Sequence, residues 1–246
     1  MRVLCLVSTL LFLGGSDAAF ASSATETLKA AAKKGKYTYV MFYRASDAAT
    51  KSMQSLVKQQ VEKTPTNTSW VQVNVADPTA AALVKKYDAS RLAMPAVVGV
   101  APNGAVTGVF SLKVSQQQLS NAVLTPRYSE MVKKLQEQKV TLVCLQPATG
   151  GYVPADVTQL EADAHLKKHV VRVTAMANDA AEARFFQRMK VRTDIKTPVV
   201  LMFAPPGVYL GKFDASVSGQ QLATLIHKSG RCSCEACRHN HKTTTS

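Results

Sequence analysis

The chain has 246 residues, which is enough for two domains of ordinary size, each with its own core. Its 30 lysines and arginines outnumber 16 acidic residues, and the net charge of +14 favours contact with anionic surfaces. The lysines are scattered, however, and no basic patch with interleaved aromatic residues indicates nucleic-acid binding. Beyond the N-terminus no segment approaches about 20 uninterrupted apolar residues, which excludes a membrane span in the mature chain.

The N-terminus has the pattern of a secretory signal peptide. Arg2 precedes an apolar run over 3–13, and Ala19-Phe20-Ala21 has the small-residue spacing of a cleavage site. The run is too short to cross a bilayer, although an uncleaved anchor or a buried strand is the alternative interpretation. We therefore expect residues 1–21 to be removed after Ala21 and the protein to be secreted or periplasmic.

The next hundred residues alternate between helical and strand patterns. Apolar residues recur at helical spacing in some segments and alternate or run continuously in others, with Gly35 and Gly104 marking turns. The expected elements, in chain order, are a helix over 25–34, a strand over 37–43, a helix over 47–63, a strand over 70–75, a helix opened at residue 78, strands over 96–100 and 106–110, and a helix from residue 115.

The second half of the chain repeats the first at an offset of 103 residues. The 25 gapless positions from Pro95 and from Pro198 share 12 identities, which indicates a duplicated small domain. A helix over 127–138 links the copies. The expected elements of the second copy are strands over 140–145, 170–175, 199–203 and 208–213, and helices over 155–168, 179–189 and 218–227. The predicted fold is α/β, with domains at 22–125 and 126–229 and a flexible tail at 230–246, each domain a mixed sheet flanked by helices.

Two features of this pattern resemble the thioredoxin-like superfamily. Residues 42–51, FYRASDAATK, are similar to the strand-to-helix turn F-[YW]-A-x-W-C-x-x-C-K of that family. Met94-Pro95 and Thr197-Pro198 stand where the family has its cis-proline, just before a β-hairpin. The resemblance implies two tandem thioredoxin-like domains, with both of these prolines in the cis form.

Neither copy has the cysteine pair of that motif. Dithiol exchange needs a thiolate at the helix N-terminus and a resolving thiol three residues later, but Asp47 and Thr50 occupy those positions. Asp47 is suited to cap the helix, and a role as an acid–base residue is the alternative. The matching loop at 146–152 also lacks cysteine, and we expect Cys144 to be a buried small hydrophobic residue. The sequence therefore favours a protein that is not an enzyme.

The resemblance extends to the non-catalytic domains of protein disulfide isomerases. In that family the loop before the cis-proline binds extended polypeptide by backbone pairing, without any need for the cysteines. By resemblance, the peptide-binding loops here would be Met94-Pro95 and Thr197-Pro198. A polypeptide is thus the expected partner, whereas oligomeric state and specific ligand stay open.

The C-terminal tail has a group of residues suited to binding a metal ion. Three cysteines in a C-x-C-x-x-C spacing can converge on one soft cation, and a nearby histidine can supply a nitrogen ligand, which suits Zn²⁺ or Cu⁺. No cofactor is certain from this pattern. The candidate metal ligands are Cys232, Cys234, Cys237, His239 and His241.

Other interpretations of the tail and of the charge stay open. In an oxidising compartment Cys234 and Cys237 form a C-x-x-C pair that can support disulfide exchange or isomerisation, with Cys232 left for another partner such as Cys144. The cysteines can also be incidental. A third function is a basic surface protein that binds anionic polymers, for which affinity would fall steeply with salt.

Overall fold

The computed structural model describes residues 18–229, with side chains from Ala24 onward. The predicted tail site, at residues 232–241, lies outside the described residues, as does most of the predicted signal peptide. The first helix, expected from residue 25, begins earlier, at Ala18. No helix within the described range is both long and apolar enough to cross a bilayer.

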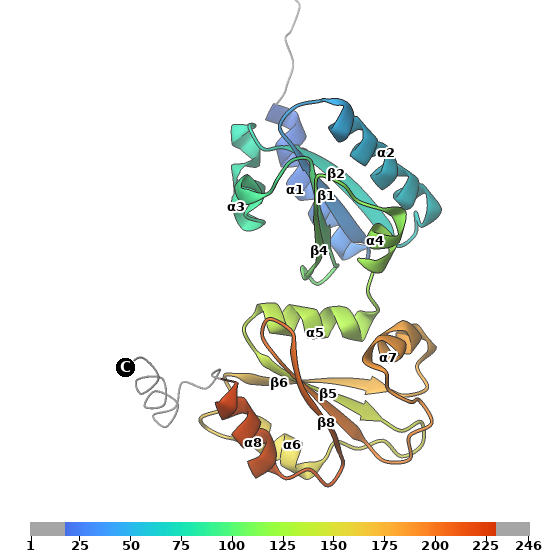
Figure 1. The fold of residues 1–246 in the computed structure, drawn as a ribbon, viewed down its shortest axis with the longest axis vertical. Coiled ribbons are helices and arrows are strands. Elements are labelled where there is room, and N and C mark those ends of the chain that lie inside the picture. Colours follow the sequence, from blue (N-terminus) through green and yellow to red (C-terminus); the bar gives the residue numbers. More distant parts are fainter. Residues whose placement is uncertain (1–17, 230–246) are drawn as a thin grey trace, which may run out of the picture.

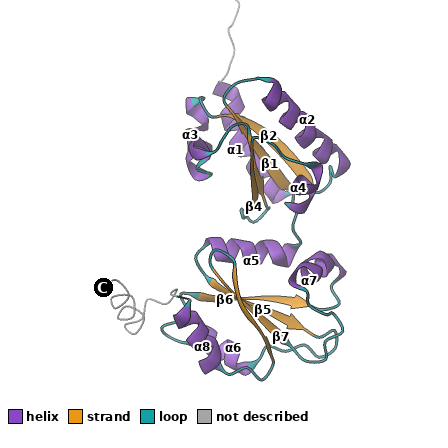
Figure 2. Cartoon of the chain, viewed as in Figure 1, coloured by secondary structure: helices purple, strands orange, loops and turns teal. Residues whose placement is uncertain are grey.

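The first domain follows the expected order of elements (Figures 1 and 2). The strands over 37–43 and 96–100 match their predictions at both ends. The elements are α1 (Ala18–Lys33), β1 (Tyr37–Tyr43), α2 (Ala48–Lys63), β2 (Thr68–Asn74), the 3₁₀ helix η1 (Pro78–Ala80), α3 (Ala81–Lys86), the 3₁₀ helix η2 (Ala89–Arg91), β3 (Ala96–Val100), β4 (Val106–Ser111) and α4 (Gln116–Asn121).

The second domain repeats that order after the linking helix. Its elements are α5 (Pro126–Gln136), β5 (Val140–Gln146), α6 (Ala155–Ala162), β6 (Val170–Met176), the 3₁₀ helix η3 (Ala180–Glu182), α7 (Ala183–Met189), β7 (Val199–Ala204), β8 (Val208–Asp214) and α8 (Gly219–Lys228).

One helix of the second domain is shorter than predicted. The helical pattern was expected to run from 155 to 168, but α6 ends at Ala162. Asp163 has a non-helical backbone (φ −56°, ψ 130°), and its carboxylate accepts hydrogen bonds from the N–H groups of His165 (2.8 Å) and Leu166 (3.0 Å). An aspartate that bonds the backbone ahead of it competes with the helix, so the chain turns here. Leu166 nevertheless stays in the core, which explains why the apolar spacing looked helical.

Both sheets have the same topology. The strand orders are β2-β1-β3-β4 and β6-β5-β7-β8. In each, the first two strands of the domain pair in parallel and the hairpin strands pair antiparallel. Each hairpin also contains an irregularity at the same place, between Gly99 and Val100 and between Met202 and Phe203. The predicted fold class is therefore confirmed: two four-stranded mixed sheets flanked by helices, with thioredoxin-like topology.

Each sheet has a hydrophobic core on both faces. In the first domain, Val40 and Phe42 of β1 face the cluster under α1 and α3, whereas Tyr39 and Met41 face the cluster under α2 and α4. This alternation follows from the two-residue period of a strand, and it buries β1 on both faces up to Phe42, with Tyr43 partly exposed. The site described below lies at the end of the sheet where β1 leads into α2.

The linking helix α5 contacts both domains (Figure 1). The side-chain amide of Gln136 donates to the carbonyl of Val106 (2.7 Å) and accepts from its N–H (3.0 Å), so α5 is tied to the start of β4. On the first domain's side, the hydroxyl of Tyr37 donates to the carbonyl of Leu124 (2.9 Å) in the linker. The two domains are thus joined by hydrogen bonds to backbone as well as by the chain itself.

Candidate functional site

The turn from β1 into α2 holds the two positions where cysteines would stand. Asp47 is the N-cap of α2, and its Oδ1 accepts from the N–H of Thr50 at 2.8 Å. That hydrogen bond, together with one from the Thr50 hydroxyl, lowers the pKa of the exposed Asp47 carboxyl. The predicted capping role is confirmed. A carboxylate held ionised in this way has no proton to donate near neutral pH and is a weak base, and neither side chain can exchange disulfides.

The proline segment of the first domain adjoins the hairpin. The Met94–Pro95 peptide bond is cis, as the resemblance implied. The carbonyl of Pro95 accepts from the N–H of Leu112 at 2.8 Å, and the Met94 side chain packs against the core. Within residues 18–229, neither the N–H nor the carbonyl of Met94 has a hydrogen-bond partner. Two residues before β3 begins at Ala96, the backbone is therefore able to pair with another chain.

An open cavity of about 250 Å³ lies between α2 and the segment that follows β4. Leu112 has φ +66° and leaves 57% of its surface exposed, although it is a large apolar residue. The Pro95–Leu112 hydrogen bond connects this cavity to the proline segment. Its lining is mostly apolar: Ala49, Ser52, Met53, Leu56, Leu112, Lys113 and Val114.

The second domain does not reproduce this arrangement. The Thr197–Pro198 bond is not cis, which corrects the expectation; the cis bond of this domain joins Pro205 to Pro206 in the hairpin turn. Trans is the ordinary form of an X–Pro bond. Thr197 is exposed, whereas Met94 packs into the core, so the second domain lacks the side-chain packing that accompanies the cis segment in the first. None of the four predicted peptide-binding residues lines the cavity; Pro95 is linked to it by its hydrogen bond with Leu112, and Met94 precedes Pro95.

Cys144 lies on β5 and is fully buried in the core of the second domain. Burial raises the pKa of its thiol to about 12, so the thiolate is scarce near neutral pH. The prediction of a small buried hydrophobic residue is confirmed. Within residues 24–229 no cluster of three or more histidine, cysteine and acidic side chains could hold a metal ion. The predicted tail ligands lie outside that range, and the metal site stays a prediction.

Sequence reasoning did not identify Leu112, Lys113 or Val114 as part of the site. These residues follow a strand and carry no motif. They reach the proline segment through a hydrogen bond between positions far apart in sequence. The available signal was an apolar residue directly after the strand, where a polar turn residue is usual.

Comparison with known proteins adds limited information. No family model matches the chain, and no curated protein matches it. Among solved structures, a disulphide isomerase from Xylella fastidiosa Temecula1 is 20% identical, with coverage of 45% of this chain and 93% of that one and a TM-score of 0.30. The alkylhydroperoxide reductase AhpF of Enterococcus faecalis is 19% identical, with coverage of 83% and 98% and a TM-score of 0.32.

A third similar structure is the zinc-bound form of human ERp44. It is 10% identical, with coverage of 85% of this chain and 60% of that one and a TM-score of 0.37. At such scores these likenesses carry no argument about activity. The thioredoxin-like fold stated above rests on the strand order, the strand directions and the cis Met94–Pro95 bond.

Proposed function

We propose that this protein binds extended polypeptide without catalysing disulfide exchange. The binding site is a groove of the first domain, formed by the Met94–Pro95 segment and the cavity beside Leu112. The supporting observation is the unpaired backbone of Met94, next to Pro95, whose carbonyl is hydrogen-bonded to Leu112 in the wall of an open apolar cavity. Adding a strand to an exposed backbone gives affinity through main-chain hydrogen bonds, and adjacent pockets give side-chain preference. Asp47 and Thr50 leave the groove without exchange chemistry.

The geometry suggests how the polypeptide is held. The N–H and carbonyl of Met94 pair with the main chain of the ligand. A medium-sized apolar side chain of the ligand then enters the cavity of about 250 Å³ and contacts Leu112. Burying the exposed part of Leu112 adds hydrophobic free energy to that binding.

A matched pair of substitutions tests this function. Leu112→Asp places a charge in the groove and suits the left-handed backbone there, since aspartate tolerates positive φ better than leucine. Val208→Asp introduces the same charge at an apolar residue of the second domain that is 54% exposed. We expect Leu112→Asp to weaken binding of fluorescein-labelled, reduced and carboxymethylated lysozyme by about tenfold or more, measured by fluorescence anisotropy, and Val208→Asp to leave it nearly unchanged.

Two results would contradict the proposal. Equal binding by both variants would show that the groove is not the site. Insulin reduction at the rate of a true thioredoxin would show that the protein is an exchange enzyme, with the Cys234–Cys237 pair as its active site if serine substitutions abolish the activity.

The tail supports a second proposed role, soft-metal capture after export from the cell. The burial of Cys144 argues against a disulfide between this residue and the tail, which leaves Cys232, Cys234 and Cys237 to react among themselves or with a metal. Native mass spectrometry of protein purified from an oxidising compartment distinguishes metal binding by these cysteines from disulfide formation between them. Bound zinc or copper that disappears when the three cysteines are replaced supports metal capture, whereas a mass lower by about two hydrogens per disulfide supports redox chemistry.

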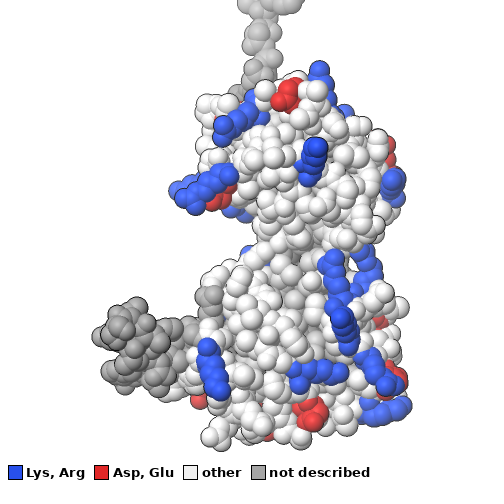
Figure 3. All heavy atoms as spheres, viewed as in Figure 1, with Lys and Arg blue, Asp and Glu red and all other residues white. Residues whose placement is uncertain are grey.

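Binding to anionic polymers has less support. Figure 3 shows lysine and arginine side chains spread over both domains on the face displayed, without one dominant patch. Affinity for heparin that falls steeply between low and physiological salt would favour this alternative.

A further inference from the structure

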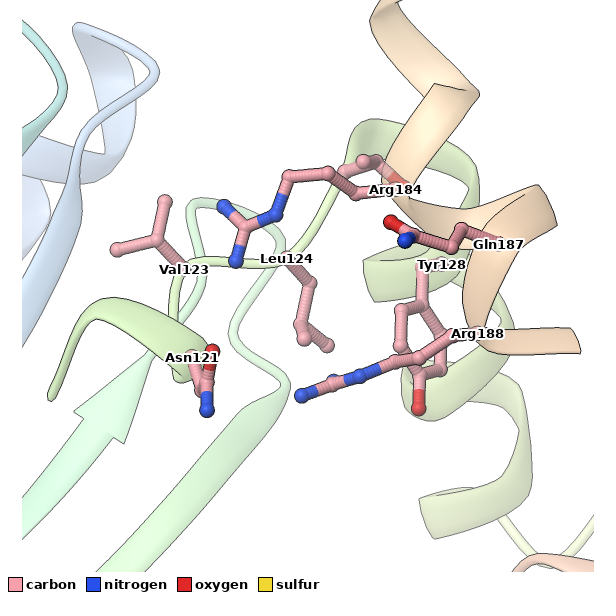
Figure 4. A pocket seen from close by; sticks show the side chains of 8 residues that line it. Asn121, Val123, Leu124, Tyr128, Arg184, Gln187 and Arg188 are labelled. Carbon is pink, nitrogen blue, oxygen red and sulfur yellow. The ribbon is translucent and has the colours of Figure 1, made fainter. Parts of the chain in front are cut away.

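A second pocket, of about 310 Å³, lies where the two domains meet (Figure 4). The end of α4 and the linker form one side, and α5 and α7 form the other. It is separate from the groove described above and shares no residue with it. Its lining residues are Asn121, Val123, Leu124, Thr125, Tyr128, Arg184, Gln187 and Arg188.

Two arginines give the pocket its charge. Arg184 and Arg188 are one helical turn apart on α7, and both side chains extend toward the segment that holds Asn121, Val123 and Leu124 (Figure 4). Within the described chain neither guanidinium forms an ion pair. No acidic residue lines the pocket.

The position of Arg188 is supported by an aromatic ring. Its guanidinium carbon lies 5.6 Å from the centre of the Tyr128 ring, within the range of a cation–π contact. Since Tyr128 belongs to α5, the contact connects the arginine to the linking helix. One of the two cations is thus held at the pocket without an acidic partner.

Thr125, which lines the pocket, has a buried hydroxyl without a partner among the described residues. Thr125 is the N-cap of α5, where a threonine hydroxyl usually accepts a hydrogen bond from the helix backbone. Here Oε1 of Glu182 accepts from the N–H of Arg127 at 2.7 Å, and the Thr125 hydroxyl makes no cap bond. Thr125 is only 8% exposed, and its Oγ1 has no hydrogen-bond partner within the described residues. An unpaired buried hydroxyl is costly. Oγ1 is shielded from solvent, so a ligand in the pocket would remove that cost once the Thr125 side chain rotates toward it.

We propose that this pocket binds a phosphate monoester. The guanidinium fork matches phosphate oxygens, and two arginines balance the charge of about −2 that such a group carries at neutral pH. The amides of Asn121 and Gln187 supply further donors, and the Thr125 hydroxyl adds one when its side chain rotates into the pocket. The Asn121 oxygen already accepts from Gln117, so its NH₂ is the group to donate. Val123 and Leu124 can contact the carbon body of the ligand.

Phenyl phosphate, titrated by calorimetry into the full-length protein, is the first probe. The variant Arg184→Gln/Arg188→Gln removes two charges from the pocket. The control Lys167→Gln/Lys168→Gln removes two charges from exposed residues of the same domain. We expect the arginine variant to weaken binding more than about tenfold and the lysine variant to change it less than about threefold at equal ionic strength. Equal losses, or no saturable binding by the wild-type protein, would overturn the proposal.

Thr125→Val tests the hydroxyl with little change in volume. We expect about tenfold weaker binding of phenyl phosphate, as for a lost hydrogen bond to a charged group, together with an unchanged circular dichroism spectrum. Wild-type affinity in this variant would contradict the role of Thr125. A phosphotyrosine peptide that binds more than about tenfold tighter than phenyl phosphate would identify a phosphorylated polypeptide as the source of the group, and equal affinities would identify a small molecule. Benzoate that binds as tightly as phenyl phosphate would show that the site takes carboxylates and would overturn the assignment to phosphate.

Discussion

The two domains share their packing framework and differ at one end of the sheet. Both hairpins have the irregularity at equivalent positions, and both last helices begin with a capping box, Ser115 with Gln118 and Ser218 with Gln221. A Cβ at Gly108 or at its counterpart Gly211 would lie within 2.7 Å of the phenylalanine ring two residues later. The features that hold the sheet and its helices together are therefore present in both copies.

The difference lies around the turn into the second helix of each domain. In the first domain this helix has 16 residues and is capped by Asp47, and the cis Met94–Pro95 segment is linked to the cavity through the Pro95–Leu112 hydrogen bond. In the second domain it has 8 residues and begins after Pro154, which has no side chain to cap it. The two domains thus share their packing but differ at this end of the sheet. We infer that the first domain holds polypeptide, while the second contributes the arginines of the pocket at the domain boundary.

The largest expected effects come from matched leucines in the last helices. Leu119 of α4 and Leu222 of α8 are both fully buried, and replacement by alanine removes apolar contacts and leaves a cavity. We expect each substitution to destabilise its own domain by about 2–5 kcal/mol. The single tryptophan, Trp70, lies on β2 of the first domain, so urea titration followed by its fluorescence reports on that domain alone.

In that experiment, Leu119→Ala shifts the fluorescence transition, whereas Leu222→Ala shifts mainly the circular dichroism of the second domain. Equal shifts of the fluorescence transition by both variants would instead show that the domains unfold as one unit, through the hydrogen bonds that α5 makes to the first domain.

The capping boxes predict a smaller and equal effect in the two copies. The hydroxyl of Ser115 accepts from the N–H of Gln118 at 3.2 Å, and that of Ser218 accepts from the N–H of Gln221 at the same distance. Alanine at either position leaves a helix N–H unpaired and costs about 1 kcal/mol. Urea titrations of the two variants measure this cost, with Gln117→Ala, at an exposed residue of α4 two positions after Ser115, as the control. A loss in only one domain would mean that the boxes are equal in geometry but not in energy.

Sequence patterns predicted the elements well and the site only in part. Strands such as Tyr37–Tyr43 are long apolar runs, and both N-cap serines precede helical spacing, so their signals are local. The end of α6 at Asp163 depends on a side chain that competes with a helix of suitable apolar spacing. The groove and the pocket depend on contacts between distant segments, such as the Pro95–Leu112 bond, and local patterns carry no signal for these.

The smallest predicted effect is a pH dependence of stability that comes from the Asp47 cap of α2 and that α6, which begins after Pro154, lacks. The N–H of Thr50 lowers the pKa of Asp47 below its ordinary value of 3.8, so the ionised carboxylate stabilises the folded state. That contribution is complete above the unfolded pKa and is lost as the pH falls through the lower folded pKa. We expect Asp47→Asn, which retains an oxygen acceptor but no charge, to be less stable than wild type at pH 7. The difference should shrink below about pH 4, as measured through Trp70.

The second domain supplies the control for this titration. Its Asp163 and Asp214 also have a lowered pKa, because backbone N–H and hydroxyl groups donate to their carboxylates. Because of these two carboxylates, the stability of the second domain, followed by circular dichroism, should depend on pH to the same extent in wild type and in Asp47→Asn. The variant should therefore alter only the fluorescence transition. A difference between the two proteins that persists unchanged at pH 2.5, about one unit below the unfolded pKa, would show that Asp47 acts through its shape and not its charge.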